Sequence, residues 1–219
     1  MVRTNYDRQM AEMNRLLLTM GAAVENAIEM AVQALADQDR QLAEKTIISD
    51  DEIDSLEKEI EQICLNLILR QQPVAGDLRR VSTVLKMITD LERIGDHAED
   101  ISEITLLLTG STYAHHPSHI FTMAEITKKM VTDSLNAFVR DDRGLARAVI
   151  GSDDQVDQLF CMVKSDLIAL VHEDIAEGEK AMDWLMVAKY LERVGDHAVN
   201  IAEWVIFSIT GQHKNSRIL

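Results

Sequence analysis

The chain has 219 residues, of which 47% are hydrophobic, 4% are aromatic and only two are proline. All-β sandwiches and barrels need a turn every ~8–12 residues, and two prolines and nine glycines are too few for that many turns. The formal charge of −15, from 37 acidic and 22 basic residues, also disfavours nucleic-acid binding, because no basic patch is evident along the chain. Residues that favour helices dominate the composition, which predicts an all-α protein.

The chain carries no sign of secretion or of a membrane span. Its first residues lack the apolar segment of a signal peptide, and no stretch approaches ~18 uncharged apolar residues. Cys64 and Cys161 stand alone without the spacing of a disulfide framework or a metal-binding motif, which is typical of a reducing compartment. We therefore expect a cytoplasmic protein.

Loop signals divide the sequence into six predicted helices. Glycine is favoured just after a helix, and Gly110 and Gly211 occupy such positions. Pro73 with Gly76 marks a turn in the first half, and residues 176–178 mark the matching turn in the second half. The predicted helices span residues 5–36, 39–70, 75–108, 118–139, 142–176 and 179–209.

Three segments occur twice in the same order and at nearly constant spacing, which indicates an internal duplication. Residues 39–43, 49–54 and 91–98 recur as residues 142–146, 152–157 and 191–198. Short loops between long helices make neighbouring helices antiparallel. The expected architecture is therefore two tandem three-helix bundles, comprising a first repeat at 1–110, a linker at 111–117 and a second repeat at 118–219.

The third predicted helix of each repeat carries acidic residues along the line of an apolar, core-facing stripe that begins at Leu78 and Val81. At about 100° per residue, this line contains Glu92, Asp96, Glu99 and Glu103. The second repeat carries Glu192, Asp196 and Glu203 in the same arrangement. A different side of the helix, which we interpret as its solvated face, carries Arg79, Lys86, Arg93 and His97.

The second predicted helix adds carboxylates at the same heights. An antiparallel hairpin centred on Pro73 brings Asp50 level with Asp96 and Asp54 level with Glu92. In the second repeat, Asp153 lies level with Asp196 and Asp157 with Glu192, within about one turn of the loop. Like charges one turn apart destabilise a helix by ~0.2–0.5 kcal/mol per pair, so these carboxylates need a positive partner.

A shared multivalent cation supplies such a partner, because hard cations prefer oxygen ligands. The sequence leaves its identity open among Mg, Mn, Fe and Zn. The alternative is that Arg or Lys from another helix pairs with the carboxylates, or that they line a wet groove. The candidate metal ligands are Glu92, Asp96, Glu192, Asp196, Asp50, Asp54, Asp153 and Asp157.

Other residues of the duplicated block allow more than one interpretation. Glycine within a helix costs ~1 kcal/mol relative to alanine, so Gly95 and Gly195 indicate either a neighbouring group that needs space or close helix packing. His97 and His197 point about 100° away from the adjacent aspartates, and we expect them to be surface or capping residues. Arg93 and Arg193 are interpreted as salt-bridge or partner-binding residues.

Motifs for enzymatic catalysis are missing. The sequence has no Glu-x-x-His or His-Glu-x-x-His segment, no phosphate-binding glycine loop and no nucleophile elbow. No set of basic residues suited to holding phosphate is evident either. These observations predict a protein that is not an enzyme.

The duplicated strings LERIGDHAEDI and LERVGDHAVNI resemble the PhoU family of bacterial phosphate-uptake regulators. That family has two repeated three-helix bundles, each with an acidic E(D)xxxD motif on its third helix, here Glu92 to Asp96 and Glu192 to Asp196. The resemblance spans essentially the whole chain. Its specificity comes from the duplicated setting, because a single E(D)xxxD occurs in many acidic helices.

The resemblance implies a non-enzymatic adaptor that keeps the phosphate-starvation response silent when phosphate is plentiful. Its implied partners are a sensor histidine kinase and the ATPase subunit of a phosphate ABC transporter, and it implies a homodimer that binds metal through the E(D)xxxD carboxylates. Glu99 and Asp100 are matched by Val199 and Asn200, so the second site has fewer charges. The alternative is a metal-dependent hydrolase of a phosphate compound.

Overall fold

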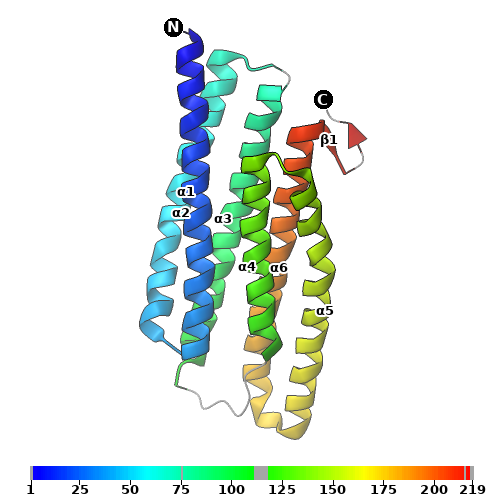
Figure 1. Ribbon diagram of the computed structural model, residues 1–219. Coiled ribbons are helices and arrows are strands. Elements are labelled where there is room, and N and C mark those ends of the chain that lie inside the picture. The colour runs from blue at the N-terminus through cyan, green and yellow to red at the C-terminus, as the bar shows by residue number, and fades with distance from the viewer. Residues whose placement is uncertain (1, 75, 111–117, 215, 218–219) are drawn as a thin grey trace.

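The computed structural model describes residues 2–74, 76–110, 118–214 and 216–217. Within these residues the chain forms six long helices, one 3-10 turn and a short β-hairpin (Figure 1). The helices are α1 (Val2–Asp37), α2 (Arg40–Gln71), α3 (Gly76–Leu108), α4 (Ser118–Arg140), α5 (Arg143–Glu173) and α6 (Gly178–Thr210). The predicted all-α, duplicated fold is confirmed, and the helix bounds agree with the predicted ones to within three residues at every end.

The repeated aspartates Asp39 and Asp142 determine where α2 and α5 begin. Each has an extended backbone, and its carboxylate accepts hydrogen bonds from the two backbone N–H groups at the second and third positions beyond it. Such a cap satisfies donors that have no partner within the helix and contributes ~1 kcal/mol. At the other end of the chain, Gly211 closes α6 with φ at 74° and donates its N–H to the Phe207 carbonyl, as expected for a helix-ending glycine.

The predicted helix 142–176 is too long at its C-terminal end. It stops at Glu173 because Asp174 adopts an extended conformation, with φ at −142° and ψ at 109°. The Asp174 carboxylate accepts a hydrogen bond from the Ala176 N–H and so starts a separate 3-10 turn, η1 (Ile175–Glu177). Aspartate often competes for the backbone in this way, which makes it a helix breaker as well as a helix cap.

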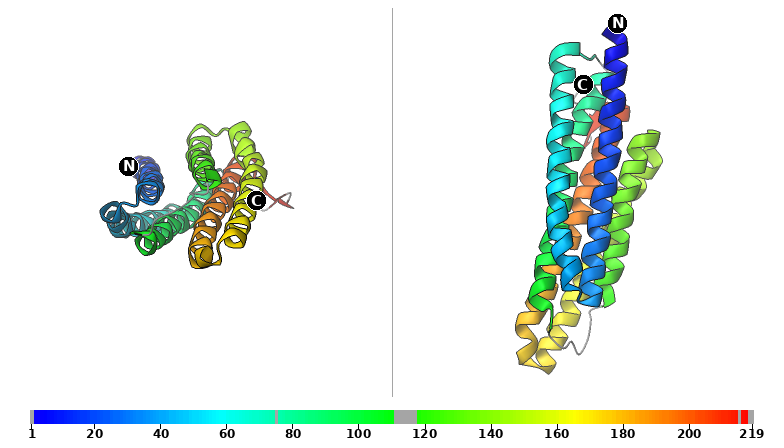
Figure 2. Two further views of the ribbon diagram at one scale, coloured as in Figure 1. Left: turned by 90° about the horizontal axis from the view of Figure 1, so that it is seen from below. Right: turned by 90° about the vertical axis from the view of Figure 1, so that its left-hand side faces the viewer.

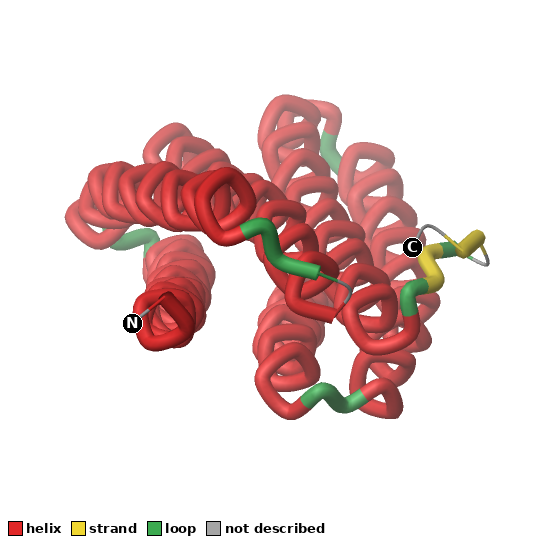
Figure 3. The backbone as a smooth tube through the Cα atoms, turned by 90° about the horizontal axis from the view of Figure 1, so that it is seen from above, coloured by secondary structure: helices red, strands yellow, loops and turns green. Residues whose placement is uncertain are grey.

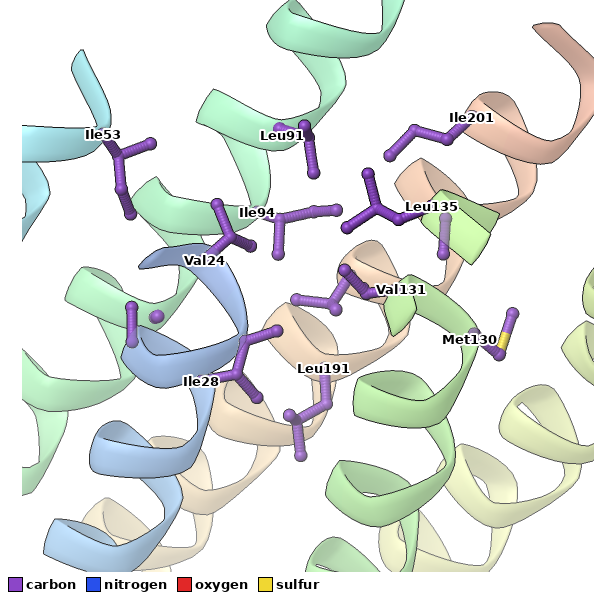
Figure 4. Close-up of a cluster of buried hydrophobic side chains, with 14 of the residues drawn as sticks. Val24, Ile28, Ile53, Leu91, Ile94, Met130, Val131, Leu135, Leu191 and Ile201 are labelled. Atoms are coloured by element: carbon purple, nitrogen blue, oxygen red, sulfur yellow. The ribbon is translucent and has the colours of Figure 1, made fainter. Parts of the chain in front are cut away.

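Helices α1–α3 pack against one another, and α4–α6 do the same (Figure 2). The two bundles are joined along their length, because α3 packs on α6 and α1 packs on α4. One continuous hydrophobic cluster contains residues from all six helices. In Figure 4, Ile28 of α1 and Ile94 of α3 lie near Val131 of α4 and Leu191 of α6. The shared core fixes the two repeats side by side.

The loops that connect the helices lie at the ends of the bundle, as the view along the bundle shows (Figure 3). After α6, strand β1 (Gln212–His213) pairs antiparallel with β2 (Ser216–Arg217), a hairpin that the sequence did not predict. The predicted linker at 111–117 lies outside the described residues, and the division into 1–110 and 118–219 remains a prediction. No helix in the described part of the chain is long and apolar enough to cross a membrane.

Candidate functional site

The structure brings the first set of predicted carboxylates together between α2 and α3. Asp50 of α2 is half-buried, and its Oδ1 atom is fully buried without a hydrogen-bond partner. Burial is the main cause that raises the pKa of Asp50 to about 7, and the charges of Glu99, Asp96, Asp54 and Glu92 raise it further. The predicted hairpin register is therefore right, and it creates a group of like charges beside the core.

Gly95 of α3 makes room for this group. A Cβ atom at position 95 would lie 2.8 Å from Asp50 Oδ1 and 3.0 Å from Ile53 Cδ1, both closer than ordinary contacts. Of the two interpretations of this glycine, the structure favours a neighbouring group that needs space. The group is the carboxylate of Asp50, which approaches the α3 backbone where a side chain would otherwise stand.

The second repeat forms a similar but looser cluster between α5 and α6. Burial raises the pKa of Asp153, and Asp196, Asp157, Asp154 and Glu192 add to the effect. The pKa of Asp196 is also raised, first by burial and then by Glu192. A Cβ atom on Gly195 would lie 3.6 Å from Asp153 Oδ1, which is an ordinary contact. The second cluster therefore leaves more space around its central aspartate.

Lysine or arginine side chains contact both clusters, but within the described residues each belongs to the same helix as the carboxylate it contacts. Arg93 contacts Asp96 at 2.8 Å and Glu92 at 3.4 Å, and both partners belong to its own helix. Lys58 contacts Asp54 at 2.8 Å, and Lys189 contacts Glu192. Arg93 and Lys58 are more than half exposed, and exposed pairs of this kind contribute only ~0–1 kcal/mol. Negative charge therefore remains in excess, and it is greatest around Asp50.

The predicted orientation of α3 needs a correction. The line of fully buried residues runs through Leu91, Ile94, Ala98 and Ile101, whereas Glu92, Asp96 and Glu99 are half-buried at its edge and Glu103 is exposed. The supposed solvated face is also wrong in part, because it lies against α6. His97 is only 6% exposed, and Arg79 donates to the Ser208 carbonyl of α6 at 3.4 Å. One helix wheel cannot show this second contact, because the face that meets α6 is polar.

Polar residues of α3 and α6 pair across the junction of the bundles, which we call the seam. Here the prediction of surface or capping histidines is wrong for His97, whose ring stacks on Tyr190 with centroids 5.4 Å apart. His97 Nδ1 lies 3.2 Å from an Asp100 carboxylate oxygen, and His197 Nδ1 lies 2.8 Å from Asp90 Oδ1. Both histidines are thus oriented by carboxylates.

The seam explains one difference between the repeats. Asn200 occupies the position that corresponds to Asp100 and donates from Nδ2 to Asp90 Oδ1 at 3.2 Å. An aspartate there would bring two carboxylates together, whereas the amide supplies a donor. Sequence reasoning missed the seam, although Thr83, Ser102 and Thr105 are polar residues buried in α3, and Thr83 donates to the Trp204 carbonyl of α6 at 3.3 Å.

The acidic clusters fit a hard cation by the chemistry of their donors. Every predicted ligand is a carboxylate, and the buried oxygen of Asp50 lacks a positive or donating partner. Within the parts of the chain that the structure describes, no three His, Cys, Asp or Glu side chains are grouped closely enough to hold an ion as they stand. Metal binding would therefore require side-chain rotation and displacement of Arg93 or Lys189.

Comparison with known proteins agrees with the fold and the motifs. A PhoU-domain family model matches residues 17–105 and 120–205. Two relatives, from Clostridium acetobutylicum and Aquifex aeolicus, are both named phosphate-specific transport system accessory protein PhoU homolog. The first is 39% identical over 213 residues and covers 97% of each chain. The second is 40% identical over 186 residues and covers 85% of this chain and 84% of its own.

Two solved structures have the same architecture. PhoU from Pseudomonas aeruginosa superimposes with a TM-score of 0.91 at 33% identity, covering 94% of this chain and all of the other. The phosphate transport system regulatory protein PhoU from Streptococcus pneumoniae gives a TM-score of 0.86 at 28% identity, covering 94% and 98%. The chain is thus one of the duplicated all-α proteins in which two three-helix bundles lie side by side. It belongs to the PhoU family.

The two helix glycines provide a matched pair for testing the space around Asp50. Alanine improves helix propensity by ~1 kcal/mol at either position, but at position 95 its Cβ meets Asp50 and Ile53. We expect Gly195→Ala to be neutral or stabilising and Gly95→Ala to be less stable than Gly195→Ala by at least about 1 kcal/mol. Urea unfolding of both variants measures this difference, and equal free energies of unfolding would contradict the close approach.

The raised pKa of Asp50 has a defined effect on stability. Because its pKa is about 7 in the folded chain, above its ordinary value of 3.8, unfolding favours ionisation in that range. The contribution of Asp50 to stability is therefore greatest below pH 4 and declines as the pH rises toward 7. Asp50→Asn should melt at a higher temperature than the unmodified protein at pH 8, with the difference vanishing near pH 4.

The neighbouring exposed residue Asp51 supplies the control for this pH series. Asp51→Asn removes the same formal charge without removing the buried oxygen. Thermal unfolding of both variants in metal-free buffer from pH 4 to 8 separates the two effects. Two results would contradict a raised pKa of Asp50 in the folded protein. One is a change in melting temperature caused by Asp50→Asn that does not depend on pH, and the other is a change that matches that of Asp51→Asn throughout.

Proposed function

We propose that this protein is a regulatory accessory protein of phosphate transport that restrains the phosphate-starvation response when phosphate is plentiful. The observation that carries the proposal is the match of both repeats to the PhoU domain. In addition, a relative named as an accessory protein of phosphate transport aligns with this chain over nearly its full length. Nothing in the duplicated block supplies a nucleophile with a matched base, which supports a role through protein contacts rather than turnover.

The proposed mechanism is that of an adaptor. It contacts the ATPase subunit of a phosphate ABC transporter and a sensor histidine kinase, as the family resemblance implies, and acts in the cytoplasm as a homodimer. The shared core between α3 and α6 supports this role, because it holds the two repeats at a fixed spacing. A rigid six-helix body of this kind presents the outer faces of both bundles to partners at the same time.

The proposal includes a metal ion at each acidic cluster. Asp50, Asp54, Glu92 and Asp96 would hold it in the first repeat. Asp153, Asp157, Glu192 and Asp196 would hold it in the second. When bound, a multivalent cation would neutralise the carboxylates that α2 and α3 contribute to the first cluster and those that α5 and α6 contribute to the second. The protein's own contribution is to place these oxygens at one height and, through Gly95, to let Asp50 reach the α3 backbone.

Affinity capture from phosphate-replete bacteria tests the adaptor function. We expect tagged protein to recover a transporter ATPase or a sensor kinase, and light scattering of the purified protein to give twice the mass of the chain. The control is the same capture with the tag alone. Recovery of neither partner, together with metal-dependent hydrolysis of a phosphomonoester that is lost in Glu92→Ala plus Glu192→Ala, would overturn the proposal in favour of a hydrolase.

A further inference from the structure

A pocket opens at the seam, on the side of the molecule where α3 and α6 meet the segment after β1. Its volume is about 620 Å³, within the ~300–1,000 Å³ typical of small-molecule sites. Its charged and titratable lining comes from both repeats and from the C-terminal segment. These residues are Arg93, His97, Arg193, Asp196, His197 and Lys214.

The lining is basic in a protein whose net charge is −15. Two arginines and one lysine face one carboxylate, that of Asp196, so the lining groups carry a formal charge of +2 with neutral histidines. The acidic side chains behind the histidines are already engaged, because Asp100 lies against His97 and Asp90 accepts from His197 and Asn200. Arg93 and Lys214 each have an acidic partner outside the lining, so the positive charge of the lining that stays uncompensated among the described residues is that of Arg193.

Arg193 is the residue most available to a ligand. It is exposed and makes no ion pair with any residue that the structure describes, unlike its counterpart Arg93, which pairs with Asp96 and Glu92. Its guanidinium lies near enough to His97 to help lower the pKa of that imidazole, although burial is the larger cause. The guanidinium of Arg193 therefore keeps its N–H donors for an anion in the pocket.

Arg93 and Lys214 keep donors for the same ligand. Arg93 is 55% exposed and uses two of its five N–H groups, and Lys214 is 59% exposed and has Glu203 as its one ion-pair partner among the described residues, at 3.0 Å. Guanidinium groups bind planar pairs of phosphate oxygens, and an ammonium adds a point charge. The three cations come from α3, from α6 and from the residue after β1, and all three line the same pocket.

We infer that this pocket binds a phosphate group, either as free orthophosphate or as the phosphate of a small organic molecule. A phosphate group carries about −1.5 to −2 charge at neutral pH and has several acceptor oxygens, so it can accept from Arg193 and from the remaining N–H donors of Arg93 and Lys214 at the same time. The pocket exceeds the size of orthophosphate, which favours an organic phosphate. The sequence alone left open whether phosphate binds, because Arg93 and Arg193 are far apart in sequence and reach one pocket only through the packing of α3 on α6.

Because Asp196 lines the pocket and is also a proposed metal ligand, the test uses protein treated with chelator and then dialysed, so that no metal ion contributes to binding. Titration of this protein with orthophosphate, followed by 31P NMR and calorimetry, should show saturable binding. Arg193→Gln should weaken binding at least about tenfold, because it removes the unpaired guanidinium without changing the helix. Arg147→Gln, which removes an exposed arginine of α5 that does not line the pocket, should bind as the unmodified protein does.

A second titration with a nucleoside monophosphate and a sugar phosphate identifies the source of the phosphate group. Tighter binding of either ester than of orthophosphate assigns the site to an organic phosphate, and equal or weaker binding assigns it to the free ion. Absence of saturable binding for all three compounds would overturn the inference. Equal losses in Arg193→Gln and Arg147→Gln would also overturn it, because the binding would then be non-specific.

Discussion

The close approach of the Asp50 carboxylate to the backbone of Gly95 determines how the first repeat is built. The carboxylate lies where the Cβ atom of any other residue at position 95 would meet it, with Ile53 packed beside it. The close approach also places a buried, unpartnered oxygen among four other carboxylates, which costs stability as long as all of them are ionised. A hydrophobic core shared by six helices compensates for this cost.

The duplication produces an acidic cluster in each repeat, but the space around the central aspartate differs between the two. Around Asp153 the contacts with Gly195 are ordinary, and the carboxylates have fewer neighbours of like charge because Val199 stands where Glu99 stands in the first repeat. The ion pairs of the two clusters also differ. Arg93 contacts Asp96 in the first cluster, whereas Lys189 contacts Glu192 in the second. Arg193, the counterpart of Arg93, makes no ion pair among the described residues. The same motif has thus produced one tight and one open cluster. The open one borders the pocket at the seam through Asp196.

Most of the fold could be predicted because its signals are local or repeated. Loop residues bound each helix, and the antiparallel hairpin follows from short turns, so the levels of Asp50 and Asp96 could be worked out from the chain alone. The end of α5 was missed because Asp174 can either continue a helix or cap the next turn, and the sequence does not decide between these. The seam was missed because contact between α3 and α6 is a property of the whole fold. His97 and Asp90 are polar, and polar residues on a helix are normally solvated.

We propose that a multivalent cation neutralises the carboxylates around Asp50, whose negative charges otherwise repel one another. The most direct measurement is the melting temperature of chelator-treated protein before and after addition of Mn²⁺, compared with Asp50→Asn under the same conditions. The account predicts that Mn²⁺ raises the melting temperature of the unmodified protein and raises that of Asp50→Asn much less. A melting temperature that does not respond to Mn²⁺ or Mg²⁺, or that rises equally in both proteins, would contradict it.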